Sequence, residues 1–129
     1  MADIYGTTNK IMNSIKIVYN NLKKNYLNAG KDILFETNLK RLQEFFNLDS
    51  NEVALFCLMI VEYFRFDEVP VNIGILSNQL ETNPLRILEF YDEFQSLEEK
   101  GFIYSDSRKK EKSLSKYYRV SEQVVEAII

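Results

Sequence analysis

Two groups of charged side chains carry most of the chemistry that this sequence offers. A segment in the second half of the chain places carboxylates at Glu89, Asp92 and Glu93. A polar loop further along carries five cations, which are Arg108, Lys109, Lys110, Lys112 and Lys116. Exposed carboxylates on a helix favour docking of a basic partner, whereas clustered cations favour contact with the phosphates of nucleic acid. Both groups indicate binding.

The residues needed for common catalytic and metal sites are missing or isolated. The chain has no histidine and one cysteine, which excludes histidine-based catalysis and the usual zinc sites. Its four glycines are separate from one another and form no phosphate-binding loop. Cys57 lies in an apolar run and is predicted to be a buried hydrophobe. We therefore expect no enzymatic activity, no cofactor and no metal site in this chain.

The charges are segregated along the sequence, although the net charge is only −3. Residues 10–41 hold seven basic and two acidic residues, residues 44–99 hold two basic and twelve acidic, and residues 106–119 hold six basic and two acidic. The acidic middle block makes insertion of its helices into a DNA groove unfavourable. Two simpler interpretations stay open, namely that the acids form a solvated helix face and that the basic loop is a solvated hairpin tip.

Three helices are expected in the first half of the chain. An apolar stripe predicts a helix over residues 9–28, which Gly30 would end. A second helix is predicted over residues 37–47 with Thr37 as its cap. A third, over residues 51–66, would be capped by Asp49 or Ser50, and it is apolar nearly all round, so it should be the central buried helix. Lysines on the first helix could form a second basic patch or an interface with another subunit.

The second half predicts a helix-turn-helix followed by a hairpin. Asn72 should cap a short helix over residues 73–80, and Asn83-Pro84 should begin one continuous helix over residues 84–100. On that helix Glu89 and Glu93 would share a face. Gly101 should end it. Residues 102–104 and 117–120 are β-prone and flank the basic loop, and Ser121 could cap a last helix.

These elements predict an α+β fold that is mostly helical: a winged helix-turn-helix domain over residues 49–129, preceded by two extra helices in residues 1–48. The length of 129 residues suits this size of fold. No apolar run is long enough to span a membrane, and the first residues do not form a signal peptide, so we expect a cytoplasmic location and no membrane contact.

The second part of the chain contains four segments in a characteristic order. An apolar helix after Asp49 is followed by Asn83-Pro84 with Ile87-Leu88-Glu89-Phe90. Next come Leu97-Glu98-Glu99-Lys100-Gly101 and a last helix after Tyr118-Arg119-Val120. This series, over residues 40–129, resembles the winged-helix region that precedes the ATPase module of a group of bacterial AAA-type ATPases. The resemblance implies that the ATP-binding residues lie downstream and that the chain is the N-terminal fragment of a longer protein. It also implies that the chain is a regulatory or substrate-recruiting module of an ATPase.

The leading hypothesis is a non-catalytic protein-interaction module at the N-terminus of an AAA-type ATPase, with Glu89, Asp92 and Glu93 facing a protein partner or another part of the parent chain. The alternative is a DNA-binding regulator that contacts phosphates through the basic loop. A third class is a purely structural dimerisation domain, because the first helix is compatible with homodimer formation.

Overall fold

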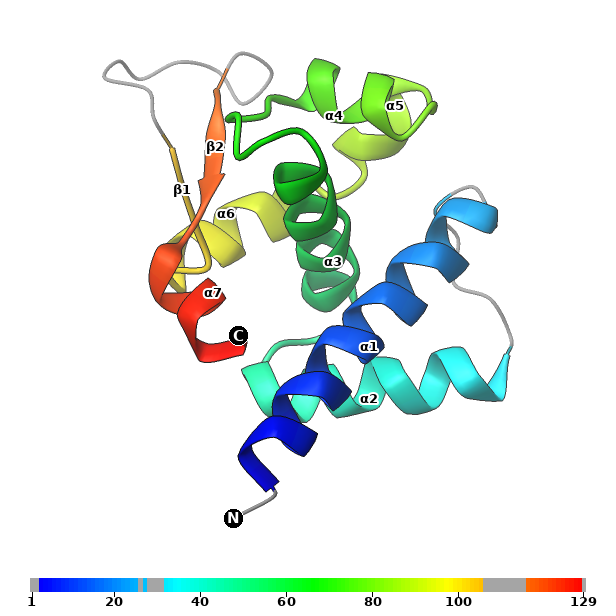
Figure 1. The fold of residues 1–129 in the computed structure, drawn as a ribbon. Helices are drawn as coiled ribbons and strands as arrows, with labels where there is room; N and C mark the ends of the chain where they lie inside the picture. Colours follow the sequence, from blue (N-terminus) through cyan, green and yellow to red (C-terminus); the bar gives the residue numbers. More distant parts are fainter. Residues whose placement is uncertain (1–2, 26, 28–31, 106–115, 129) are drawn as a thin grey trace.

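The computed structural model describes residues 3–25, 27, 32–105 and 116–128, with side chains from Lys10 onward. The chain is mostly helical and carries a small two-stranded antiparallel sheet, as the sequence predicts (Figure 1). The elements are α1 (Asp3–Lys24), α2 (Ile33–Phe46), α3 (Ser50–Arg65), α4 (Ile73–Gln79), α5 (Pro84–Leu88), α6 (Tyr91–Glu99), β1 (Ile103–Ser105), β2 (Tyr118–Val120) and α7 (Glu122–Ile128).

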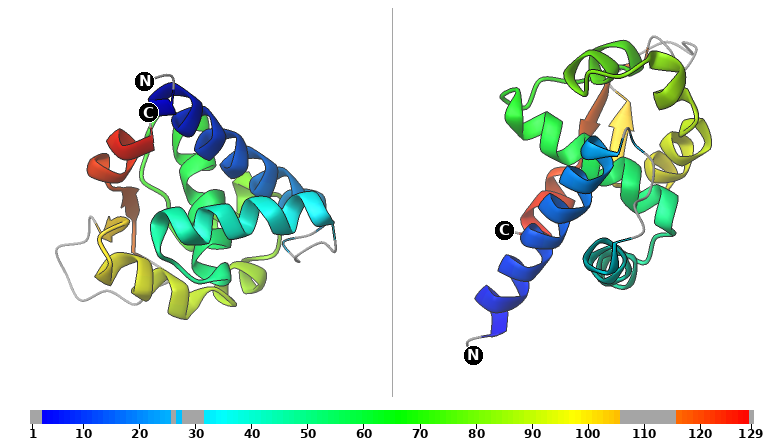
Figure 2. Two further views of the ribbon diagram at one scale, coloured as in Figure 1. Left: turned by 90° about the horizontal axis from the view of Figure 1, so that it is seen from below. Right: turned by 90° about the vertical axis from the view of Figure 1, so that its right-hand side faces the viewer.

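Helix α3 is the centre of the fold, and the other helices surround it (Figures 1 and 2). Every residue from Val53 to Ile60 is buried, which confirms the prediction of a central helix. Its first turn is closed by a capping box. The Asp49 carboxylate accepts from the backbone N–H of Glu52 at 2.8 Å, and the Glu52 carboxylate accepts from the N–H of Asp49 at 2.9 Å.

The two N-terminal helices pack against α3 and against each other. Helix α1 begins six residues earlier than predicted and ends at Lys24, whereas the predicted stop signal at Gly30 lies outside the described residues. A buried polar contact joins the pair, because the hydroxyl of Ser14 donates to the side-chain oxygen of Asn38 at 2.7 Å. Buried residues of α1, α2 and α3 belong to one hydrophobic cluster. The division of the chain at residue 48 remains a prediction.

The predicted start of α2 is wrong by four residues. Asp32 is the N-cap, and its carboxylate accepts from the N–H of Leu34 at 2.9 Å. Thr37 lies inside the helix, where its hydroxyl donates to the carbonyl of Ile33 at 2.8 Å. A threonine can bond the carbonyl four residues back within a helix, so its presence does not identify a helix start.

Helix α4 begins where the sequence predicts. The side chain of Asn72 caps it by accepting from the N–H of Ile75 at 2.7 Å. The next helix also begins as predicted, because Asn83 accepts from the N–H of Leu85 at 2.9 Å and Pro84 takes the first helical position.

The continuous helix predicted over residues 84–100 is two helices, α5 and α6. The interruption lies at Phe90, whose backbone has φ −95° and ψ 17°. Its N–H donates to the carbonyl of Ile87 at 2.9 Å, which is a three-residue instead of a four-residue step. The inward positions still agree with the prediction, since Ile87, Phe90, Phe94 and Leu97 are all buried.

Gly101 ends α6 with φ 83°, a conformation that glycine adopts without strain. The chain then enters β1, which pairs with β2 in the register Ile103↔Val120. A third segment joins the sheet, because Val71 and Tyr118 exchange backbone hydrogen bonds of 3.1 and 2.8 Å. The segment between α3 and α4 is thereby fixed beside the hairpin.

Candidate functional site

The three carboxylates predicted to bind a partner lie on two short helices. Glu89 follows the end of α5, and Asp92 and Glu93 lie in the first turn of α6. Glu89 and Glu93 therefore do not occupy one turn of a continuous helix, contrary to the prediction, because the bend at Phe90 separates them. The break has no proline or glycine to announce it.

Glu89 is exposed and paired. Its carboxylate lies 2.7 Å from a guanidinium nitrogen of Arg86, and 61% of the Glu89 side chain is accessible to solvent. Arg86 also donates to the backbone carbonyl of Leu27 at 3.0 Å. A surface pair of this kind contributes little to stability. Through Arg86, however, Glu89 is connected to the chain that follows α1.

Asp92 is exposed, whereas Glu93 is partly buried. The pKa of Glu93 is raised, first by burial and then by the negative charges of Asp49, Asp92 and Glu52. Carboxylates gather here from two helix N-termini, those of α3 and α6, where the helix dipoles favour negative charge. We call Glu89, Asp92 and Glu93 the acidic surface. A basic group brought to this surface would relieve the mutual repulsion of its carboxylates.

The lysine at the end of α6 is paired with a buried acid. The ammonium of Lys100 lies 2.8 and 2.9 Å from the two oxygens of the Glu52 carboxylate, which also accepts from the hydroxyl of Ser96. Burial opposes ionisation of Glu52, but the hydrogen bonds from Asp49, Lys100 and Ser96 outweigh it and lower its pKa. Lys100 therefore neutralises a buried acid, and Glu52 is satisfied.

Glu98 also has a structural role. One oxygen of its carboxylate accepts from the backbone N–H of Ser105 in β1 at 3.1 Å. The other lies 4.0 Å from the ammonium of Lys116, just before β2. Glu98 thus connects α6 to both sides of the hairpin, whereas the helical pattern alone predicts only an outward position for it.

Most of the predicted nucleic-acid-binding loop lies outside the described residues, namely Arg108, Lys109, Lys110 and Lys112. The remaining member of that set, Lys116, is partly buried and faces Glu98. The described part of the chain therefore brings one predicted cation against an acid of α6, which reduces the positive field at the base of the hairpin.

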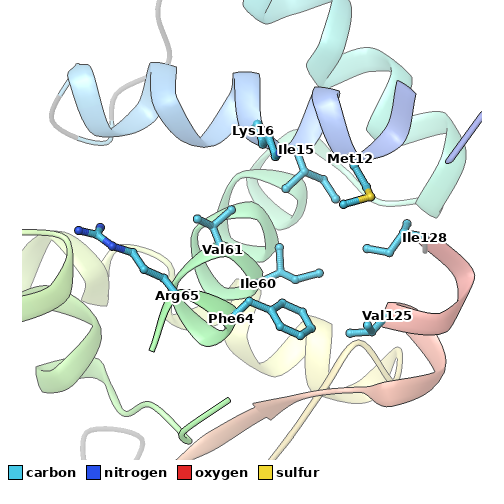
Figure 3. A pocket seen from close by; sticks show the side chains of 9 residues that line it. All are labelled: Met12, Ile15, Lys16, Ile60, Val61, Phe64, Arg65, Val125 and Ile128. Atoms are coloured by element: carbon cyan, nitrogen blue, oxygen red, sulfur yellow. The ribbon is translucent and has the colours of Figure 1, made fainter. Parts of the chain in front are cut away.

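Sequence reasoning missed an apolar groove on another face of the molecule. Figure 3 shows it between α1, α3 and α7, with a volume of about 510 Å³. Its lining consists of Met12, Ile15, Lys16, Ile60, Val61, Phe64, Arg65, Val125 and Ile128. The one signal in the sequence is the pair of apolar residues at positions 125 and 128, which share a helix face. The groove itself depends on how three helices pack.

Other features bear on chemistry. Cys57 is fully buried in α3, and burial raises the pKa of its thiol, which confirms the prediction of a buried hydrophobe. Among the residues that the structure describes, no group of three or more histidine, cysteine, aspartate or glutamate side chains could hold a metal ion. Within the same ranges, no helix combines the length and the apolar character needed to cross a bilayer.

Comparison of this chain with protein-family models, with curated proteins and with solved structures found no match.

Proposed function

We propose that this chain is a non-catalytic protein-interaction module of the winged helix-turn-helix type. The order α3, α4, α5–α6, β1 and β2 supports this fold, as does the bridge between Val71 and Tyr118, which adds a third short segment to the sheet. In this interpretation α5 and α6 together take the position of the recognition helix. The strands β1 and β2 take the position of the hairpin that carries the wing, and residues 106–115 lie outside the described part of the chain.

The observation that carries the proposal is the charge of α5 and α6. Asp92 and Glu99 are exposed, Glu93 is partly exposed, and Lys100, the lysine that caps α6, is bonded to buried Glu52. Arg86 is engaged with Glu89 and with a backbone carbonyl. DNA binding gains most of its affinity by neutralising phosphates, so this surface favours a partner rich in lysine and arginine.

The resemblance of residues 40–129 to a region of bacterial AAA-type ATPases supports a more specific proposal. The module would regulate the ATPase or recruit its substrates. The residues that bind ATP would belong to a downstream part of the parent chain. Sequencing the gene beyond codon 129 tests this part of the proposal separately from the binding experiment below.

The binding proposal is tested by fluorescence anisotropy with two labelled probes, an octa-arginine peptide and a random-sequence DNA duplex. We expect the chain to bind the peptide in preference to the duplex. The double variant Asp92→Lys/Glu93→Lys should weaken peptide binding by about tenfold or more. The matched control is Glu36→Lys/Glu44→Lys, which changes the charge equally at exposed positions of α2, and its effect should be much smaller.

The opposite result would favour the DNA-binding alternative. In that case the chain would bind the duplex, affinity would fall by about a hundredfold or more between 50 and 200 mM salt, and Lys109→Glu/Lys110→Glu would abolish it. Equal loss of peptide binding in the test and control variants would show that net charge alone governs binding, and the acidic surface would lose its assigned role.

A further inference from the structure

The apolar groove is bordered by opposite charges on its two sides. Among the nine residues that line it, the charged ones are Lys16 on α1 and Arg65 on α3, and both are cationic. A smaller hollow shares Phe64 and Val125 with the groove and is lined by further side chains that include Glu68, Glu122 and Glu126. In Figure 3, Lys16 and Arg65 stand away from α7, the helix that carries two of these three acids.

We propose that this face binds a second copy of the chain and forms a two-fold symmetric dimer. In such a dimer the same patch meets itself, so each feature on one side of the axis must complement the feature on the other side. A central apolar strip with cations along one edge and carboxylates along the other meets this requirement. Lys16 and Arg65 of one copy would face Glu122 and Glu126 of the other.

The apolar centre of the patch is incompletely covered in a single copy. Phe64 is 43% exposed and Met12 is 36% exposed, and both line the groove. Burial of apolar surface yields about 25 cal/mol per Å² removed from water, so covering these side chains favours association. The core of a homodimer interface is typically apolar with charges at its rim, which is the arrangement seen here.

The shape of α1 supports the same partner. The helix begins at Asp3, and its first turns extend past the end of α7 (Figure 2, right). That part of the sequence contains Gly6, Thr7, Thr8 and Asn9, which have low intrinsic helix propensity. Helices of low propensity take their stability from tertiary packing. A second copy seated on the groove would lie beside these turns and supply such packing.

The first experiment measures the mass of the 129-residue chain by sedimentation equilibrium from about 1 µM to about 1 mM, a range that covers weak to moderate association. We expect a monomer–dimer equilibrium. Val125→Arg, in the apolar strip, should weaken the dimer by about a hundredfold. Leu85→Arg is the control, since Leu85 on α5 is 68% exposed and does not line the groove.

A charge-swap mixture tests the two-fold arrangement without relying on a change in the apolar strip. In a homodimer of Lys16→Glu, the new carboxylate of each copy would face Glu122 and Glu126 of the other copy. In a homodimer of Glu122→Lys/Glu126→Lys, the new lysines of each copy would face Lys16 of the other copy. Both homodimers therefore place like charges together at both contacts. A mixed dimer of these two chains pairs opposite charges at both contacts. Native mass spectrometry of an equimolar mixture should therefore show more heterodimer than the random ratio, and each variant alone should dimerise more weakly than the wild type.

Three results would overturn the proposal. They are a monomer throughout the concentration range, a dimer that Val125→Arg leaves intact, and a random distribution in the charge-swap mixture. The second and third would assign dimerisation to another face. None of these results bears on the acidic surface, which lies on α5 and α6, so the interaction module and the dimer can fail independently.

Discussion

The ammonium of Lys100 and the carboxylate of Glu52 form a two-pronged ion pair across 48 residues of sequence, with both N–O distances below 3.0 Å. Glu52 is 2% exposed and lies in the first turn of the central helix, while the Lys100 side chain is 45% exposed and lies at the C-cap of α6. The pair joins the capping box of α3 to the C-terminus of α6. It satisfies a buried charge, and it removes a cation from the acidic surface.

Replacing Lys100 by methionine should destabilise the fold by about 2 kcal/mol. A buried carboxylate that loses its cation is costly, although the hydrogen bonds from Asp49 and Ser96 remain and Lys100 is partly solvated. Urea denaturation measures this free energy of unfolding. The double variant Glu52→Gln/Lys100→Met should recover part of the loss, and a single variant as stable as the wild type would contradict the structural role of the pair.

Acid should weaken the fold through Glu52. Its pKa in the folded chain is lowered from the ordinary value of 4.5. The stabilising contribution is therefore complete above that value, and it is lost as the pH falls through the lower folded-state pKa. Urea denaturation between pH 6 and pH 2 should show a smaller acid-induced loss in Glu52→Gln than in the wild type. Parallel curves for the two chains would refute this assignment.

Glu93 should have the opposite effect. Burial and neighbouring carboxylates raise its folded-state pKa, so its contribution is favourable below the ordinary value of 4.5 and is lost as the pH rises through the folded-state pKa. Glu93→Gln should therefore stabilise the chain at pH 7, by less than about 1 kcal/mol because the group is partly solvated. The gain should vanish near pH 3. Glu99→Gln, at an exposed position of the same helix, should leave stability nearly unchanged at both values.

The sequence left two candidates for the cap of α3, and the structure distinguishes them. Asp49→Ala should cost about 1 kcal/mol or more, because it removes the side-chain acceptor for the N–H of Glu52. Ser50→Ala should change the free energy of unfolding by less than about 0.5 kcal/mol, since Ser50 is an exposed residue of the first turn. Thermal unfolding of the two variants gives the comparison, and equal effects would rule out the capping box.

Two glycines should respond in opposite directions to alanine. Gly101 has φ 83°, and an added Cβ meets nothing within 4 Å, so Gly101→Ala isolates the backbone strain, which should cost about 1 kcal/mol. Gly74 lies inside α4, where an added Cβ would be 3.4 Å from the side-chain oxygen of Asn72. Gly74→Ala should be neutral or stabilising through helix propensity. The same thermal unfolding assay applies, and a neutral Gly101→Ala would contradict the described turn.

Local signals in the sequence located most elements correctly. Asn72 and Asn83-Pro84 begin helices and Gly101 ends one, because each of these residues satisfies or permits a specific backbone conformation at that point. The start of α2 was misplaced because a threonine inside a helix looks like a cap. The break at Phe90 was missed because it arises from a change of hydrogen-bond step, and a phenylalanine gives no sign of this.

The functional features divide in the same way. The acidic surface was visible as a local excess of carboxylates. The role of Lys100 depends on Glu52, which is 48 residues away in the sequence, and the role of Glu98 depends on how the hairpin folds back on α6. The groove is harder still, since its lining comes from three helices spread over most of the chain. Apolar residues at its edge resemble ordinary core positions until the packing of α1, α3 and α7 is known.

The bridge between Val71 and Tyr118 closes the backbone into a non-covalent ring that contains α4, α5, α6 and β1. Elements enclosed in one such ring tend to open together, as a cooperative unit of local unfolding. The amide protons of Val71 and Tyr118 should therefore exchange with solvent at similar, slow rates, and release of the bridge would expose the enclosed helices as a group. The hairpin therefore contributes to the cooperative stability of the C-terminal half of the chain, and this role does not depend on a ligand.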